Sequence, residues 1–156
     1  MKVEKKAVRS GILKLEKNVQ ITLDEDMNVP DTRPDVEKII ESRGEVHIDE
    51  IEVLTDRLRL RGNFLVQILY LSTDPEQQIS CMEHDFAIEE FMNVEGAESS
   101  DIAKVTADLE DLTISIINSR KCGVRSVIYF HIANLRNEIC RMYNRNREKG
   151  KCPVPV

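Results

Sequence analysis

The sequence has no tryptophan and no long apolar run. Its seven aromatic residues are Phe64, Tyr70, Phe86, Phe91, Tyr129, Phe130 and Tyr143, so we expect a core built mainly from aliphatic side chains. The longest apolar runs are Phe64–Val66, Ile68–Leu71 and Val127–Phe130. Each is far shorter than the roughly 20 residues that a helix needs to cross a bilayer. The sequence therefore predicts no membrane span.

A secretory signal is also not visible. Residues Met1 to Lys6 include three lysines, but no apolar segment or small-residue cleavage site follows them, and a signal peptide needs both. We therefore expect the chain to be made inside a cell and to stay there at first. With 156 residues, 41% of them apolar and 32% charged, the composition is typical of one ordinary folded domain and excludes a disordered protein.

The four cysteines, Cys81, Cys122, Cys140 and Cys152, include no CxxC pair. Structural zinc sites and thioredoxin-like motifs use such pairs, and the three histidines are equally scattered, so we expect no metal. In a reducing compartment, Cys122 and Cys81 would be small apolar core residues. Cys140 and Cys152 lie in a polar, basic segment whose Arg and Lys residues favour the thiolate. These two are the candidates for inter-chain disulfides in an oxidising environment.

Motifs of common enzyme classes are missing as well. The sequence has no GxSxG nucleophile elbow, which serine hydrolases use. Its six glycines are isolated, whereas loops that bind phosphate groups bring glycines together. The acidic pairs Glu89-Glu90 and Glu110-Asp111 lie where solvated strand faces or strand ends are expected, which does not favour a paired-carboxylate glycosidase. We therefore expect no enzyme and no cofactor.

The sequence does have a strong charge asymmetry. Residues 1–17 carry a net charge of +4, residues 18–135 one of −14 and residues 136–156 one of +4. An acidic body repels backbone phosphates, so we do not expect the fold to bind nucleic acid. Arg136, Arg141 and Arg145 are candidates for contacts with the acidic body of another copy or of a partner. A polyanionic partner for these residues, or a role in solubility alone, stays open as an alternative.

Hydrophobic periodicity favours strands over most of the chain. Alternating apolar residues predict strands over 45–53, 58–70, 77–84, 86–92 and 124–132, and one or two short strands over 7–23. Gly62 is expected to mark a bulge. Residues 102–117 fit both helical and strand spacing, and we choose a strand, while residues 133–143 stay open between the two. The expected fold is mainly β, a sandwich or curled antiparallel sheet.

One short helix is expected near residues 34–42. Residues 24–35 combine an acidic run with two prolines and predict a loop before it. Pro34 fits the first turn of a helix, and Val36, Ile39 and Ile40 would form one apolar face. The loop would then be an anchored, charged contact surface beside a sheet edge. Its candidate contact residues are Pro30, Asp31, Arg33, Pro34 and Asp35.

The chain is expected to have three parts: a basic segment 1–17, a β-rich domain 18–135 and a basic, cysteine-containing segment 136–156. Four sequences follow one another along it: VPDTRPDVEKIIESRGEVHI, LRLRGNFLVQILYLS, FAIEEFMNVEGAE and VTADLEDLTISIINSRKCGVRSVI. In this order they resemble the SPOCS domain of spore-coat assembly proteins from endospore-forming bacteria, especially Clostridia. The matching residues are Pro30, Pro34, Asp35, Ile39, Gly62, Ile68–Tyr70, Phe86, Phe91, Gly96, Ala97, Glu110, Arg120 and Lys121. The resemblance covers roughly residues 18–132.

The resemblance implies a non-catalytic protein of the spore envelope. Similar proteins often carry a peptidoglycan-binding LysM module and bind other coat morphogens, whereas this chain shows one SPOCS-like copy and no LysM segment after it. A building block of the coat or exosporium is therefore expected, made in the mother-cell cytoplasm and deposited on the spore surface. That history would also expose Cys140 and Cys152 to oxidant.

Two hypotheses for its function follow. The first is a structural subunit that self-associates head to tail into a homo-oligomer or array, together with other spore-coat proteins. The second is a monomeric adaptor that recruits another coat morphogenetic protein through residues 30–40. A third function, binding of a small molecule or polysaccharide, is disfavoured because few aromatic residues are available to stack on sugars.

Overall fold

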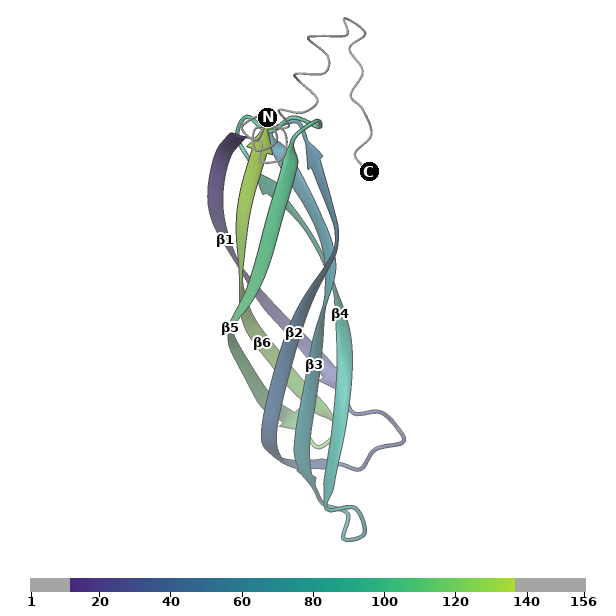
Figure 1. The fold of residues 1–156 in the computed structure, drawn as a ribbon. Coiled ribbons are helices and arrows are strands. Elements are labelled where there is room, and N and C mark those ends of the chain that lie inside the picture. Colours follow the sequence, from purple (N-terminus) through teal and green to yellow (C-terminus); the bar gives the residue numbers. More distant parts are fainter. Residues whose placement is uncertain (1–11, 137–156) are drawn as a thin grey trace, which may run out of the picture.

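The computed structural model describes residues 12–136, and within them every regular element is a β-strand (Figure 1). The strands are β1 (Ile12–Asn28), β2 (Val36–Leu54), β3 (Arg57–Ser72), β4 (Ile79–Asn93), β5 (Ile102–Asn118) and β6 (Lys121–Arg136). They are 15 to 19 residues long, against a usual length of about five or six. Each strand therefore runs along most of an elongated, twisted body.

The six strands form two antiparallel sheets, so the expectation of a mainly β fold is confirmed. Sheet A has the order β1-β6-β5 and sheet B the order β2-β3-β4, which makes β6 and β3 the central strands. Residues 29–35 and 94–101 cross from one sheet to the other. Residues 29–35, 73–78 and 119–120 lie at one end of the molecule, named here the Arg120 end. Residues 55–56 and 94–101 lie at the opposite end, the Asp101 end (Figure 1).

The inward-facing side chains of both sheets share one hydrophobic core. In the central strands alternate residues are buried, as the pleat of a strand requires. They are Leu58, Leu60, Phe64, Val66, Ile68 and Tyr70 in β3, and Cys122, Val124, Ile128, Phe130 and Ile132 in β6. Cys122 is thus the small core residue expected from the sequence. The same expectation for Cys81 is wrong, because Cys81 is exposed on the outer face of β4.

The two sheets meet along β2 and β5. Gly44 of β2 allows this approach, since a Cβ atom there would lie 2.8 Å from Cδ2 of Leu109 in β5 and 2.8 Å from a ring carbon of Phe64. The other two edge strands, β1 and β4, each pair with one strand on one side. Among residues 12–136 their second edges have no strand partner, and such free edges are sites where another strand can add.

The predicted helix at residues 34–42 is wrong, because β2 begins at Val36. Its pairing with β3 shifts between Val36 and Lys38 and again between Ile39 and Glu41. Each shift inserts one extra residue, so the core-facing positions are Val36, Ile39 and Ser42 rather than every second residue. This spacing of three imitates the apolar face of a helix, and the long ladder with β3 decides the conformation.

The predicted loop at residues 24–35 is too long. Strand β1 continues to Asn28, and Asp24 to Asn28 pair with Arg125 to Lys121 of β6. The acidic run does not end the strand because Asp24, Glu25 and Asp26 are all exposed, while Met27 enters the core. Residues 12–28 therefore form one long strand, and the loop is reduced to residues 29–35.

Gly62 is not itself a bulge, which corrects the expectation for β3. It pairs in register with Ile48 and Ile88, and the extra residue lies opposite, in β2, between Ile48 and Glu50. A Cβ atom on Gly62 would lie 2.1 Å from the carbonyl oxygen of His47. The glycine therefore allows the close approach of the bulged strand. The strand expected over 102–117 is confirmed as β5, and residues 133–136 continue β6, while residues 137–143 lie outside the described part.

Candidate functional site: the 29–35 loop and the edge of β4

The loop of residues 29–35 crosses from sheet A to sheet B at the Arg120 end, and both of its ends are fixed. Val29 and the first residue of β2, Val36, are buried. Their amide N–H groups donate to the carbonyl oxygens of Arg120 and Ser119, respectively, and each N···O distance is 2.9 Å. The β5–β6 turn therefore holds the loop at both ends, and the residues between them face outward.

The side chain of Arg120 holds the middle of this loop. Its Nη1 donates to the carbonyl oxygen of Arg33 at 2.8 Å and to Oδ1 of Asp35 at 3.0 Å. Its Nη2 donates to the carbonyl oxygens of Val29 at 3.2 Å and Pro30 at 2.9 Å. The planar guanidinium suits this arrangement, because it carries five donors in a fixed geometry. One side chain thus satisfies three backbone carbonyls and one carboxylate.

A second contact fixes the loop from the core side. The hydroxyl of Tyr70 donates to the carbonyl oxygen of Pro34 at 2.8 Å, and the tyrosine is fully buried. A buried tyrosine hydroxyl needs such a partner. Pro34 therefore lies above the core at the end of β3, with its fixed φ shaping the entry into β2.

The five contact residues expected in this loop are held in place but not buried. Pro30 and Asp31 are exposed, and Arg33, Pro34 and Asp35 are half-buried. The carbonyl groups of Pro30, Arg33 and Pro34 and the carboxylate of Asp35 accept hydrogen bonds within the molecule, as described above. Binding of a partner stays a prediction for all five.

A cleft of about 420 Å³ separates this loop from β4. It is lined by Pro30, Thr32 and Arg33 of the loop and by Gln67, Cys81, Met82 and Glu83 of sheet B. On this side of β4 the backbone has no strand partner among residues 12–136, so its outward N–H and C=O groups face solvent. The cleft therefore places a fixed loop beside a free strand edge.

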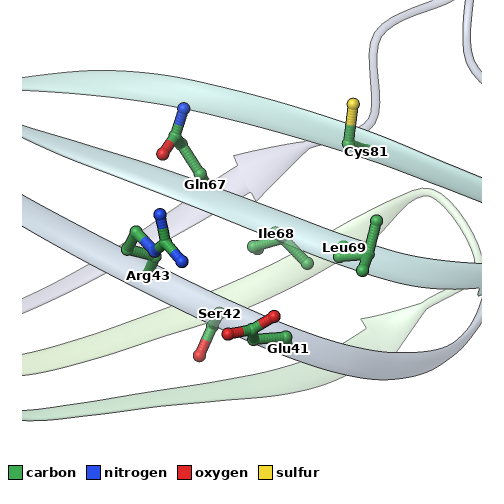
Figure 2. Close-up of a pocket in the computed structure, with 7 residues that line it drawn as sticks. All are labelled: Glu41, Ser42, Arg43, Gln67, Ile68, Leu69 and Cys81. Carbon is green, nitrogen blue, oxygen red and sulfur yellow. The ribbon is translucent and has the colours of Figure 1, made fainter.

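Figure 2 shows a second hollow, on the outer face of sheet B. Its lining comes from three adjacent strands: Glu41, Ser42 and Arg43 of β2, Gln67, Ile68 and Leu69 of β3, and Cys81 of β4. Cys81 lines both the cleft and this hollow, and its side chain is exposed. By contrast, burial raises the pKa of the Cys122 thiol. Cys81 is therefore the accessible thiol of the two described cysteines.

The carboxylates on the outer face of sheet B have cationic partners at one end of the sheet and neutral partners at the other. Toward the Asp101 end, Arg59 and Arg61 contact the carboxylates of Glu50, Glu52 and Glu89 within 3.1 to 3.9 Å. Nearer the cleft the carboxylates have neutral partners instead: Gln67 donates to Glu83 at 3.2 Å, and Asn63 donates to Asp85 at 2.7 Å. Among residues 12–136 no cation lies beside these two carboxylates, so the outer face of β4 near the cleft favours cations.

A buried carboxylate at the Asp101 end was not expected from the sequence. The side chain of Asp101 is 1% exposed; Lys14 Nζ donates to its Oδ2 at 2.6 Å, the Glu98 amide at 2.9 Å and Asn134 Nδ2 at 3.3 Å. Burial alone would raise its pKa, but these three donors and the charge of Lys14 together lower it. The group ties β1, β6 and residues 94–101 together. No local sequence motif predicts the burial of Asp101, because its partners Lys14 and Asn134 lie far from it in the chain.

Within the part of the chain that the structure describes, no three His, Cys, Asp or Glu side chains are grouped so that they could hold a metal ion. A search of the same residues finds no helix that is long and apolar enough to span a membrane.

A family model described as SipL, SPOCS domain, matches residues 35–117, more than half of the chain. The chain belongs to the SPOCS-domain family. This confirms the resemblance found in the sequence and links the chain to sporulation. No curated protein and no solved structure matches the chain.

The SPOCS match begins at Asp35, the loop residue that contacts Arg120, and ends at Ile117, one residue before the end of β5. It therefore includes all of sheet B and the strand of sheet A that meets it. β1, β6 and most of the 29–35 loop lie outside the matched residues, although they supply the central strand and one edge of sheet A.

Of the candidate residues in the segment 136–156, the structure describes only Arg136. Arg136 ends β6 at the Asp101 end, far along the strand from Lys121, which follows Arg120. Arg141, Arg145, Cys140 and Cys152 lie outside the described residues, so their expected contacts and disulfides stay predictions.

Proposed function

We propose that this SPOCS-domain protein is a non-catalytic structural subunit of the bacterial spore envelope, in the coat or the exosporium, and that it self-associates. Family membership supports the link to sporulation. The charge distribution supports association between copies, because an acidic body of −14 lies between two segments of +4 each. Opposite charges on different parts of one chain favour contacts that repeat from copy to copy.

The observation that carries this proposal is the free edge of β4, which borders a cleft and carries acidic residues. Heterologous contacts of such an edge with a different part of a second copy extend into filaments or arrays unless they close into a ring. The proposal includes that the protein is not an enzyme. In support, the hollows among residues 12–136 described above lie on an outer sheet face and beside a surface loop.

Light scattering of the full chain at low and at high salt tests the proposal. We expect the average mass to rise with protein concentration at low salt and to fall toward the monomer at high salt, since exposed charges are screened over about 10 Å at 0.1 M. A strict monomer under both conditions would contradict it.

An adaptor function is the second candidate, and the fixed loop favours it. Arg120 and Tyr70 hold the backbone of residues 29–35 before any partner binds, which lowers the entropic cost of binding. Asp31, Thr32 and Arg33 would make the contact. A pull-down from sporulating cells with Arg33→Glu as the comparison separates the two: an adaptor loses its partner, whereas self-association in light scattering is unchanged.

A further inference from the structure

The outer face of β4 carries a row of acidic residues at alternate positions. Glu83, Asp85 and Glu89 share this face, since successive side chains of a strand point to opposite sides. β4 has no Lys or Arg. Glu83 and Asp85 bond only to the amides described above, so neither has a cation beside it among residues 12–136.

Residues 145–151 carry the complementary row. Arg145, Arg147, Lys149 and Lys151 occupy every second position, so in an extended strand all four would lie on one face. Opposite charges that face each other on neighbouring strands attract. The segment therefore matches the acidic row in both spacing and sign.

We propose that residues 145–151 of one copy add to the free edge of β4 of a second copy as an antiparallel strand. This inference rests on the proposed self-association and names its contact. The antiparallel direction places Lys151 opposite Glu83, Lys149 opposite Asp85 and Arg145 opposite Glu89. Lys149 and Lys151 then face the two carboxylates that have no cation beside them among residues 12–136, whereas Arg147 faces Ala87 and Arg145 shares Glu89 with Arg59 and Arg61.

Direction also accounts for residues 152–156, which have no charged side chain. An antiparallel strand delivers them to the cleft between β4 and the 29–35 loop, where Arg33 would repel a cation. Pro153 and Pro155 lack an amide N–H and cannot continue a ladder. The strand pairing therefore ends beside the 29–35 loop. A parallel strand would instead place residues 152–156 at the other end of β4, away from the cleft.

The charge distribution favours a second copy over the same chain. Nine steps join Arg136, the last residue of β6, to Arg145, and they span at most about 30 Å. This length is enough to reach the β4 edge of the same chain or of a neighbour. An acidic edge and a basic segment on every copy let each copy accept one strand and donate another, so the contact repeats from copy to copy.

Thiol cross-linking tests the contact, because Cys152 would lie opposite Met82, one position along the strand from Cys81 and on the other face, so a cross-linker with a spacer is used. One chain carries Cys81→Ser and Cys140→Ser, the other Cys152→Ser and Cys140→Ser, and the mixture is treated with a bis-maleimide at low salt. We expect a cross-linked dimer that disappears at high salt. Two results overturn the proposal: no cross-link at all, or a cross-link within single chains only, seen when Cys81 and Cys152 are present together.

Charge reversal sharpens the test. Glu83→Lys with Asp85→Lys in the accepting copy should abolish the cross-link, and Lys149→Glu with Lys151→Glu in the donating copy should restore it, which also shows that the variant folds. The matched control is Asp108→Lys with Glu110→Lys, which makes the same change of charge at exposed positions of β5 and should have no effect. Failure of the rescue overturns the proposal.

Light scattering of the same mixtures separates this inference from the proposed function. Salt-dependent association without the Cys81–Cys152 cross-link would reject this contact and leave self-association standing. A monomer at every salt concentration would reject both.

Discussion

The two ends of the molecule hold their sheet-crossing segments with side chains of opposite charge. At the Arg120 end a cation, 38% exposed, gathers backbone carbonyls and Asp35. At the Asp101 end an anion, 1% exposed, gathers Lys14, an amide of residues 94–101 and Asn134. Both side chains fix a crossing segment, but burial decides the free-energy cost of removing them. Water can replace the partly exposed Arg120 as a partner of the loop, whereas water cannot reach the partners of the buried Asp101.

The largest effect is expected from Asp101→Ala. It leaves Lys14, whose side chain is 16% exposed, with only the more distant carboxylate of Glu98 at 3.8 Å, and removal of one partner of a buried pair costs about 3 kcal/mol. Urea denaturation measures the change in the free energy of unfolding. Asp108→Ala, at an exposed position of β5, is the control and should stay within about 0.5 kcal/mol of the wild type. Equal small changes for both variants would show that the buried group has no special role.

Arg120→Ala should lower the free energy of unfolding by less, about 2 kcal/mol. Hydrogen bonds to charged groups contribute about 1.5–3 kcal/mol, and the guanidinium of Arg120 is partly exposed to water. Arg120→Lys should recover only a part of the loss, since an ammonium group cannot reproduce the planar set of donors. Urea denaturation gives both values, and amide hydrogen exchange of residues 29–36 should quicken in the alanine variant. A lysine variant as stable as the wild type would mean that charge alone holds the loop.

The pH dependence of stability tests the role of Asp101. The pKa of Asp101 is lower in the folded protein than its usual value of 3.8, so on acidification the unfolded state takes up the proton first. The stability that this carboxylate contributes is complete above about pH 5 and is lost as the pH falls through 3.8 and below. Urea denaturation between about pH 6 and pH 3 should show the difference between wild type and Asp101→Asn shrinking. A difference that is constant over this range would contradict the lowered pKa.

The smallest effect is expected from Tyr70→Phe. This change removes only the hydroxyl that donates to Pro34 and keeps the ring in the core, so the cost is about 1 kcal/mol. Thermal or urea unfolding measures it. Tyr129→Phe serves as the control, because Tyr129 lies on the outer face of β6, and a loss as large there would remove the assigned role of the Tyr70 hydroxyl.

Much of the fold could be predicted from the sequence, and the failures have identifiable causes. Strands β3 and β6 follow simple alternation because they pair on both sides and bury one face. The start of β2 could not be read, since two bulges give Val36, Ile39 and Ser42 a helical spacing. The acidic end of β1 looked like a loop because its charges are exposed while the backbone remains paired with β6.

The candidate site was predicted only in part. Proline and charge pointed to residues 30–35, but not to Arg120, which lies more than 80 positions away and fixes their backbone. Arg120 stood out only through the resemblance to the family. Asp101 gave no signal, because a carboxylate next to two serines is typical of a solvated loop, and its burial depends on Lys14 and Asn134 from two other strands.

Electron microscopy of the purified full chain at low salt tests most directly the claim that this domain builds an assembly. The account predicts filaments, rings or arrays of elongated subunits that dissolve at high salt and that Glu83→Lys with Asp85→Lys prevents. Separate particles of single-chain size at every protein and salt concentration would contradict it.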